Sequence, residues 1–162
     1  MKLKSVLILF CFTLLPIGCG LHFGQSGDMD ESLARDLIRR NIFLEDDRFP
    51  ISDPKVYQYG NLHVDGPNGG MLYRFRSTPE ALVWIVEQHN MQQVAINEGD
   101  QLPLQFLDNV PEWWKPNKIN SNVYYIFQEE FSTGGKRQFI VLFNVPTNEI
   151  YAVEHFSDMP GG

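Results

Sequence analysis

The sequence predicts an α+β fold, in which an antiparallel sheet of about five or six strands is covered on one face by two helices, as a two-layer sandwich. Three observations predict it. Two stretches, at about residues 30–42 and 78–89, combine a helical spacing of apolar residues with capping residues. Strand-like stretches, several of them alternating, lie between and after them. Clusters of turn residues separate these strands, which favours antiparallel neighbours.

The first helix is expected over about residues 30–42. Its apolar residues share one stripe: Leu33, Leu37, Ile38 and Ile42. Asp28 or Asp30 can accept hydrogen bonds from the first free amides. The segment that follows, Glu45–Pro54, holds two prolines and four acids and is expected to be a loop. Its acids lack the spacing of an EF-hand, so we expect a solvated turn there and no calcium site.

A β-hairpin is expected next. Its first strand lies within Val56–Val64, and the residues of Asp65–Gly70 are all typical of turns. The second strand alternates between two faces. One face is apolar and the other carries arginines, with Met71, Tyr73 and Phe75 on the first and Leu72, Arg74 and Arg76 on the second.

The second helix begins at a typical start signal, Thr78-Pro79-Glu80, which supplies a capping hydroxyl, a proline and an acid. It is apolar over much of its surface, so it is expected to pack against the sheet. His89 falls in its last turn, where we expect a structural residue at the helix end and not a functional histidine.

The last forty residues predict a three-stranded meander, with strands at Val123–Phe131, Gln138–Phe143 and Ile150–Phe156. The run Phe139–Phe143 is apolar on both faces, as expected of a central strand that is covered by a helix. Upstream, Val94–Ile96 is expected to be a short strand.

The leader is a separate feature. Lys2 and Lys4 precede an apolar run from Val6 to Ile17, and small residues follow. This layout is typical of an export signal, and the run is shorter than the ~20 residues that a membrane-spanning helix needs.

The end of the leader, Leu15-Pro16-Ile17-Gly18-Cys19, resembles that of a bacterial lipoprotein precursor. The resemblance implies cleavage before Cys19, lipidation of its thiol, and anchoring in a cell-envelope membrane through acyl chains. Pro16 departs from the aliphatic residue usual there. Gly20 is not the aspartate that retains enterobacterial lipoproteins in the inner membrane, so the outer membrane is the expected destination.

An alternative remains open, in which ordinary cleavage after Gly20 gives a secreted or periplasmic product. The cysteine count favours lipidation. The two cysteines are Cys11, inside the leader, and Cys19, so cleavage before Cys19 leaves one thiol and no internal disulfide.

These boundaries give the expected organisation: a signal peptide at 1–18, a lipidated N-terminus and flexible tether at 19–29, a single α+β domain at 30–158 and a loose tail at 159–162. The net charge of the whole chain is −7 at pH 7. An acidic chain without a cluster of lysines and arginines argues against a nucleic-acid partner.

The sequence favours binding over catalysis. It contains no Gly-x-Ser-x-Gly elbow, no phosphate loop and no histidines at zinc-like spacing. We therefore expect no cofactor and no metal, although an acid/base site assembled from distant segments is compatible with the sequence.

The main binding candidate lies in Asn97–Asn122, a long segment without a clear period, and such segments are often functional. Adjacent side chains of an extended segment diverge, so one of the two tryptophans is expected to be exposed or to lie over the sheet edge. The candidate contact residues for a protein or cell-wall partner are Trp113, Trp114, Lys115 and Tyr124. The alternative is that Trp113 plugs the open end of the core while Trp114 lies over Pro116.

A second candidate is the arginine-bearing face of the hairpin. His63, Arg74 and Arg76 would suit an anionic small ligand, or a weak hydrolase. A solvated charged face is the alternative reading of the same residues.

Overall fold

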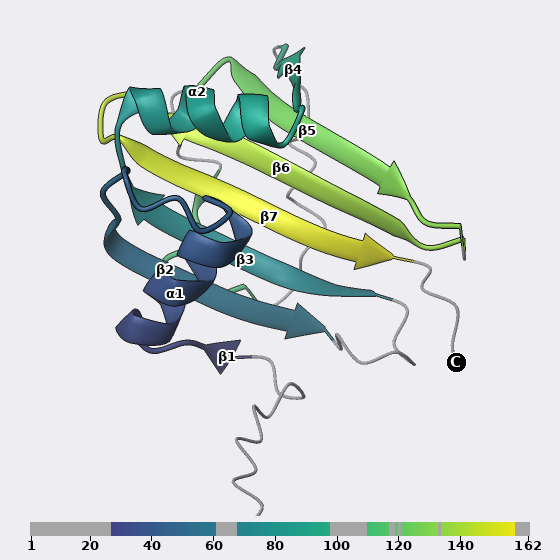
Figure 1. The fold of residues 1–162 in the computed structure, drawn as a ribbon, viewed down its shortest axis with the longest axis horizontal. Helices are drawn as coiled ribbons and strands as arrows, with labels where there is room; N and C mark the ends of the chain where they lie inside the picture. Colours follow the sequence, from purple (N-terminus) through teal and green to yellow (C-terminus); the bar gives the residue numbers. More distant parts are fainter. Residues whose placement is uncertain are drawn as a thin grey trace, which may run out of the picture.

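The computed structural model describes residues 27–60, 68–97, 110–116, 119, 121–132 and 134–157. The fold is α+β, as predicted, with two helices and a seven-stranded antiparallel open sheet (Figure 1). The elements in chain order are β1 (Gly27–Asp28), α1 (Glu31–Asn41), β2 (Ser52–Gly60), β3 (Asn68–Arg76), α2 (Pro79–Gln88), β4 (Gln92–Ala95), β5 (Val123–Glu130), β6 (Lys136–Asn144) and β7 (Glu149–Ser157).

The strand order across the sheet is β1-β2-β3-β7-β6-β5-β4. The hairpin β2–β3 and the meander β5–β6–β7 therefore join through β3 and β7, the longest-range pairing in the sheet. The strand beyond the expected five or six is β1, two residues of the predicted tether that pair with Tyr57 and Gln58. The described part of the chain thus begins at the sheet, before α1.

Helix α1 forms for the expected local reasons. The side chain of Asp30 accepts a hydrogen bond from the Leu33 amide at 3.0 Å, which satisfies one of the free amides of the first turn. The apolar stripe faces the sheet, where Ala34 and Ile38 are fully buried.

The boundary between the loop and β2 differs from the prediction. The loop expected over Glu45–Pro54 ends at Ile51, because β2 begins at Ser52. The first residues of β2 contain a shift in the register of its pairing with β3, between Ser52 and Lys55, and Asp53 has a φ of 48°. Pro54 fits in this irregular start of the strand, although its nitrogen has no hydrogen to donate. The described part of β1 pairs only with Tyr57 and Gln58, so β1 needs no hydrogen bond from Pro54.

Helix α2 begins at the predicted cap. The Ala81 amide donates to the Thr78 hydroxyl at 3.3 Å, and Pro79 stands in the first turn. His89 is the residue at the helix end. Its Nε2 donates to the carbonyl of Ile42 at 2.9 Å and its ring lies 4.8 Å from that of Phe139, so it connects α2 with the end of α1.

Burial lowers the pKa of His89, and Arg137 adds to the effect, while the hydrogen bond to Ile42 and the charge of Glu154 oppose it. The neutral ring is therefore favoured in the folded state. The stabilisation that this gives is present above the unfolded pKa of about 6.5 and is lost as pH falls through the folded pKa.

We expect the unfolding free energy of the wild type to fall more steeply between pH 6.5 and 5 than that of His89→Gln, measured by chemical denaturation at each pH. Parallel curves for the two proteins would contradict a neutral buried His89.

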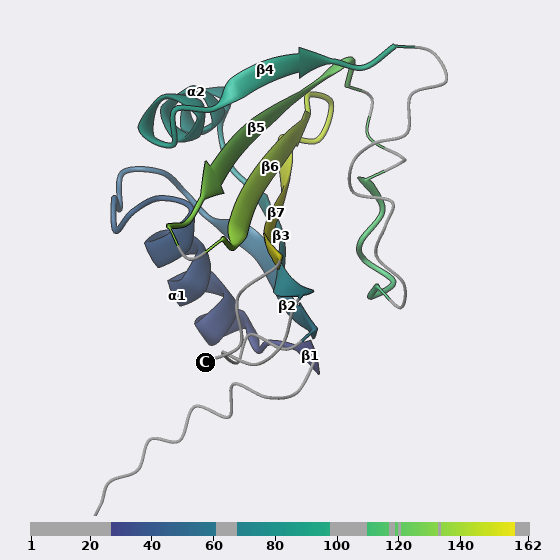
Figure 2. The ribbon, with the colours of Figure 1, turned by 90° about the vertical axis from the view of Figure 1, so that its right-hand side faces the viewer.

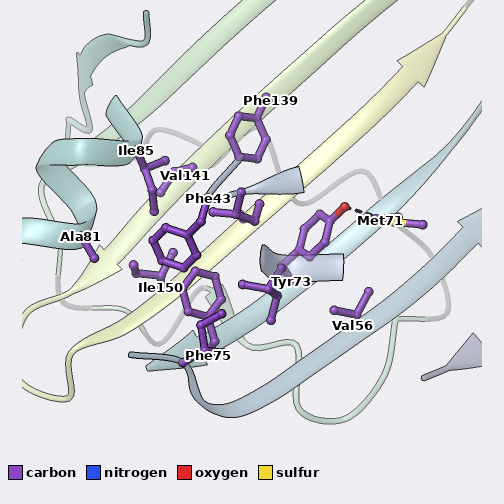
Figure 3. Packing of buried hydrophobic residues seen from close by; sticks show 14 of the residues in the cluster. Phe43, Val56, Met71, Tyr73, Phe75, Ala81, Ile85, Phe139, Val141 and Ile150 are labelled. Carbon is purple, nitrogen blue, oxygen red and sulfur yellow. Dashed lines mark hydrogen bonds between the residues drawn. The ribbon is translucent and has the colours of Figure 1, made fainter. Parts of the chain in front are cut away.

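The two faces of the sheet carry separate cores. On one face, α1 and α2 cover a cluster that includes Tyr73, Phe75, Phe139 and Val141 (Figure 3). On the other face, Leu72, Ile140 and Leu142 belong to a second cluster. The run Phe139–Phe143, expected to be a central strand covered by a helix, is buried on both faces of the sheet.

The second face is covered without a helix. Residues of the segment 110–116 and Ile119 pack on it, and Figure 2 shows this segment on the side of the sheet opposite α1 and α2. The expected two-layer sandwich therefore has a third, irregular layer. Leu72, expected on the charged face of the hairpin, is fully buried beneath this layer.

Candidate functional site

The tryptophan pair lies in the irregular layer. Trp114 is only 5% exposed, and its ring meets that of Tyr151 edge-on with centroids 5.5 Å apart. It belongs to the second cluster, with Leu72, Ile140, Leu142 and Val153. Its indole is therefore core and offers almost no surface to a partner.

Both indoles point to the same side, against the expectation that they diverge. That expectation assumed an extended chain. The segment instead turns, with the Trp114 amide donating to the Pro111 carbonyl at 2.9 Å. The two rings then contact each other at 82°, with centroids 5.9 Å apart. Trp113 is thus partly buried beside Trp114, and Trp114 packs on Tyr151.

Trp113 is partly exposed and is held by two contacts. Its Nε1 donates to Oδ1 of Asp28 at 2.8 Å, and the guanidinium of Arg74 lies 6.0 Å from its ring centroid. Of the other candidates, Lys115 is exposed and Tyr124 is partly buried against the second cluster. We use the name tryptophan surface for Trp113, Lys115 and Tyr124.

The arginines of β3 already have partners. Arg74 forms an ion pair with Asp53, and Arg76 pairs with Glu149 at 3.3 Å. An anionic ligand on this face would compete with those carboxylates. Two other predicted residues, His63 and Cys19, lie outside the described residues.

A tyrosine–histidine contact on the second face was not predicted. The hydroxyl of Tyr59 lies 2.8 Å from Nδ1 of His155, and the two rings are nearly parallel, with centroids 6.0 Å apart. The contact depends on Gly70, because a Cβ there would lie 2.6 Å from the Tyr59 hydroxyl. Burial, with a smaller contribution from Glu154, raises the pKa of Tyr59, so its hydroxyl stays protonated at neutral pH.

A polar cluster on the helix-covered face was also missed. Nε and Nη2 of Arg137 donate to Oε1 of Glu154 at 2.9 Å and 2.7 Å. The Tyr73 hydroxyl is 3.2 Å from the other carboxylate oxygen and receives a hydrogen bond from Asn41 at 2.9 Å. Burial and the charge of Glu154 hold the pKa of Tyr73 well above its usual range, so the phenol remains a donor.

The sequence did hold a signal for this cluster. Glu154 continues the parity of Ile150 and Ala152 along β7, and both of those residues are buried in the first core. A carboxylate at a core-facing position needs a partner. Arg137 has the same parity as Phe139 in β6; the register pairs Arg137 with Phe156 and Phe139 with Glu154, so Arg137 and Glu154 are diagonal neighbours on one face.

No family model, curated protein or solved structure matches the chain. Within residues 27–157, as far as they are described, no group of three or more histidine, cysteine or acidic side chains could hold a metal ion. In the same described part, no helix has the length and apolarity to cross a membrane.

Proposed function

We propose that this protein is a lipoprotein of the cell envelope, anchored through acyl chains on Cys19, and that its α+β domain is a binding module for a protein or cell-wall partner. The leader supports the anchor, since Gly18-Cys19 ends a run typical of an export signal. The residue after the cysteine is Gly20, which favours the outer membrane as the destination.

The observation that carries the binding role is the fixed position of Trp113. Its indole keeps part of its surface accessible while Asp28 and Arg74 hold it from two sides. An aromatic ring that is already ordered loses little entropy on binding, and aromatic residues supply much of the energy at contact surfaces. Lys115 beside it adds an exposed cation.

The tryptophan surface also lies near the anchored end of the domain. Asp28, which binds Trp113, belongs to β1, and only residues 20–26 separate β1 from Cys19. An extended tether of this length reaches at most about 30 Å. The surface would therefore act on a partner close to the membrane.

The second candidate function, an anionic-ligand site at Arg74 and Arg76, is less well supported. Each of these arginines already forms an ion pair, and Arg74 also contacts Trp113. Arg74 therefore supports the tryptophan surface, and an anionic ligand would have to displace Asp53 from Arg74 and Glu149 from Arg76.

Cys19→Ser tests the anchor. We expect the variant to lose lipid attachment and to leave the membrane fraction, whereas the wild type stays there and carries the mass of the acyl chains. The measurement is fractionation of cells followed by intact-mass analysis. A variant that is processed as before, together with a wild type found only in the soluble fraction, would refute the anchor.

Trp113→Ala tests the binding surface. We expect capture of the partner to fall by about thirtyfold, the effect of losing an aromatic hot spot. The measurement is chemical crosslinking in intact cells, purification from the envelope and quantification of the attached protein or glycan.

The matched control is Val83→Ala, because Val83 is an exposed apolar residue of α2, on the other side of the sheet. If Trp113→Ala and this control captured equal amounts of partner, with both variants folded, the tryptophan surface would not be the binding surface.

A further inference from the structure

A cavity of about 390 Å³ opens at the end of α1, between the helix and the sheet. It lies on the helix-covered face and shares no residue with the tryptophan surface on the opposite face. Its lining comes from the end of α1, the residues that follow, and three strands: Arg40, Asn41, Leu44, Met71, Arg137, Glu154 and Phe156. The volume is at the lower end of the range for small-molecule sites.

The inner part of this cavity is polar and ordered. Glu154, 8% exposed, is held by Arg137 on one carboxylate oxygen and by Tyr73 on the other. Asn41 in turn holds the Tyr73 hydroxyl. Figure 3 shows Tyr73 directed toward Met71, whose sulfur lies 3.0 Å from the Tyr73 hydroxyl oxygen. The donors and the carboxylate are therefore positioned before any ligand arrives.

The charge of the lining favours an anion. Two arginines face one carboxylate, in a chain whose net charge is −7. Glu154 engages Nε and Nη2 of Arg137, and among the described residues Nη1 has no acceptor. A guanidinium has five N–H donors in a planar fork that matches a carboxylate. Arg40 forms an exposed pair with Asp36 at 2.5 Å, and such pairs contribute little free energy, so Arg40 can turn to a ligand.

The rest of the lining is apolar. It is formed by Met71, which is buried, by Phe156, and by Leu44, which has 51% of its surface exposed. Leu44 also has a φ of 47°, a left-handed conformation that a bulky residue rarely adopts. Such a strained conformation destabilises the folded chain, and strain of this kind gathers at functional sites. The left-handed conformation keeps the apolar side chain of Leu44 beside the charged groups, where a ligand with an apolar part would cover this side chain.

We propose that this cavity binds a small amphipathic carboxylate, whose anionic head lies at Arg137 and Arg40 and whose apolar part covers Leu44, Met71 and Phe156. This site is independent of the binding role of the tryptophan surface. It would give the anchored domain a second ligand of a different chemical class.

The test uses the full chain in lipid nanodiscs, with ¹³C-methyl methionine as a local probe. Octanoate is the probe ligand, titrated while the methyl resonance of Met71 is followed. We expect this resonance to shift and saturate while that of Met91, which does not line the cavity, stays in place. Octylammonium, with the opposite charge, is expected to leave Met71 unchanged. Inorganic phosphate, without an apolar part, is expected to bind at least about tenfold more weakly.

Two variants locate the ligand. Leu44→Asn is expected to weaken octanoate binding about fivefold without loss of stability, because asparagine tolerates the left-handed conformation that leucine occupies there. Val145→Asn, at another exposed apolar position remote from the cavity, is its control and is expected to bind as the wild type does. Arg137→Lys keeps the charge but loses the fork, and is expected to weaken binding about tenfold.

Three results would overturn the site. These are a Met71 resonance that does not respond to octanoate, an equal response to octylammonium, and equal affinities of Leu44→Asn and Val145→Asn. If Arg137→Lys fails to fold, Leu44→Asn decides the outcome alone. Equal affinity for phosphate would refute the apolar part of the ligand.

Discussion

Replacement of Trp114 by alanine is expected to lower the free energy of unfolding by about 3–5 kcal/mol, the range for large aromatic residues removed from a core. Trp114 is 5% exposed and packs edge-on against Tyr151 and Trp113. Its removal also takes away the side chain that fixes the irregular layer to the second face of the sheet. Urea denaturation followed by far-ultraviolet circular dichroism measures the loss.

A second substitution at this position separates the effect of the ring's shape on stability from the effect of its polar Nε1 group. The Nε1 group of Trp114 is buried and has no hydrogen-bond partner in the described part of the chain. An unpaired buried donor costs about 1–3 kcal/mol. Trp114→Phe removes that donor and keeps most of the ring, so it is expected to be much less destabilising than alanine.

Trp113→Ala is the matched comparison for these variants, since Trp113 is partly exposed. We expect it to lose clearly less stability than Trp114→Ala. If Trp114→Ala melted like the wild type, the irregular layer would not be a core element, and Trp114 would return to the set of contact residues.

The second large effect is expected at Gly70. A Cβ at this position would lie 2.0 Å from the backbone carbonyl oxygen of Glu154 and 2.6 Å from the Tyr59 hydroxyl. The first obstacle is main chain, so relief requires β3 and β7 to separate where they join the two halves of the sheet. We expect Gly70→Ala to cost about 3 kcal/mol, the upper part of the usual range for overpacking.

Gly27→Ala is the control, because a Cβ at Gly27 meets no atom within 4 Å. Its unfolding free energy is expected to match that of the wild type. Combining Gly70→Ala with Tyr59→Ala should recover little stability, since the carbonyl of Glu154 remains. Full recovery in that double variant would show that the tyrosine ring, and not the strand pairing, sets the requirement for glycine.

Local signals predicted the elements well. The caps at Asp30 and Thr78 and the meander at the end of the chain are fixed by residues close together in the sequence. The start of β2 was predicted too late, because Pro54 and the acids around it are typical of a loop. Pairing with β3 overrides that preference from Ser52 onward, at the cost of an irregular register.

The candidate sites were harder to predict. Placing Trp113 and Trp114 on one face required knowledge of the turn that begins at Pro111, and an extended chain would have separated them. Similarly, Tyr73 and Glu154 are 81 residues apart, and they meet only because β3 pairs with β7.

The order of residues along the chain was enough to define the α+β class, both helix starts and the apolar central strand, while the export signal stays a prediction. These depend on spacing and on contacts within a few residues. The three-dimensional arrangement was needed to show that Trp114 is core, that Arg74 and Arg76 are paired, and that Glu154 and Arg137 line a cavity. Each of these depends on which distant strands become neighbours, and side-chain periodicity specifies a face without specifying what covers it.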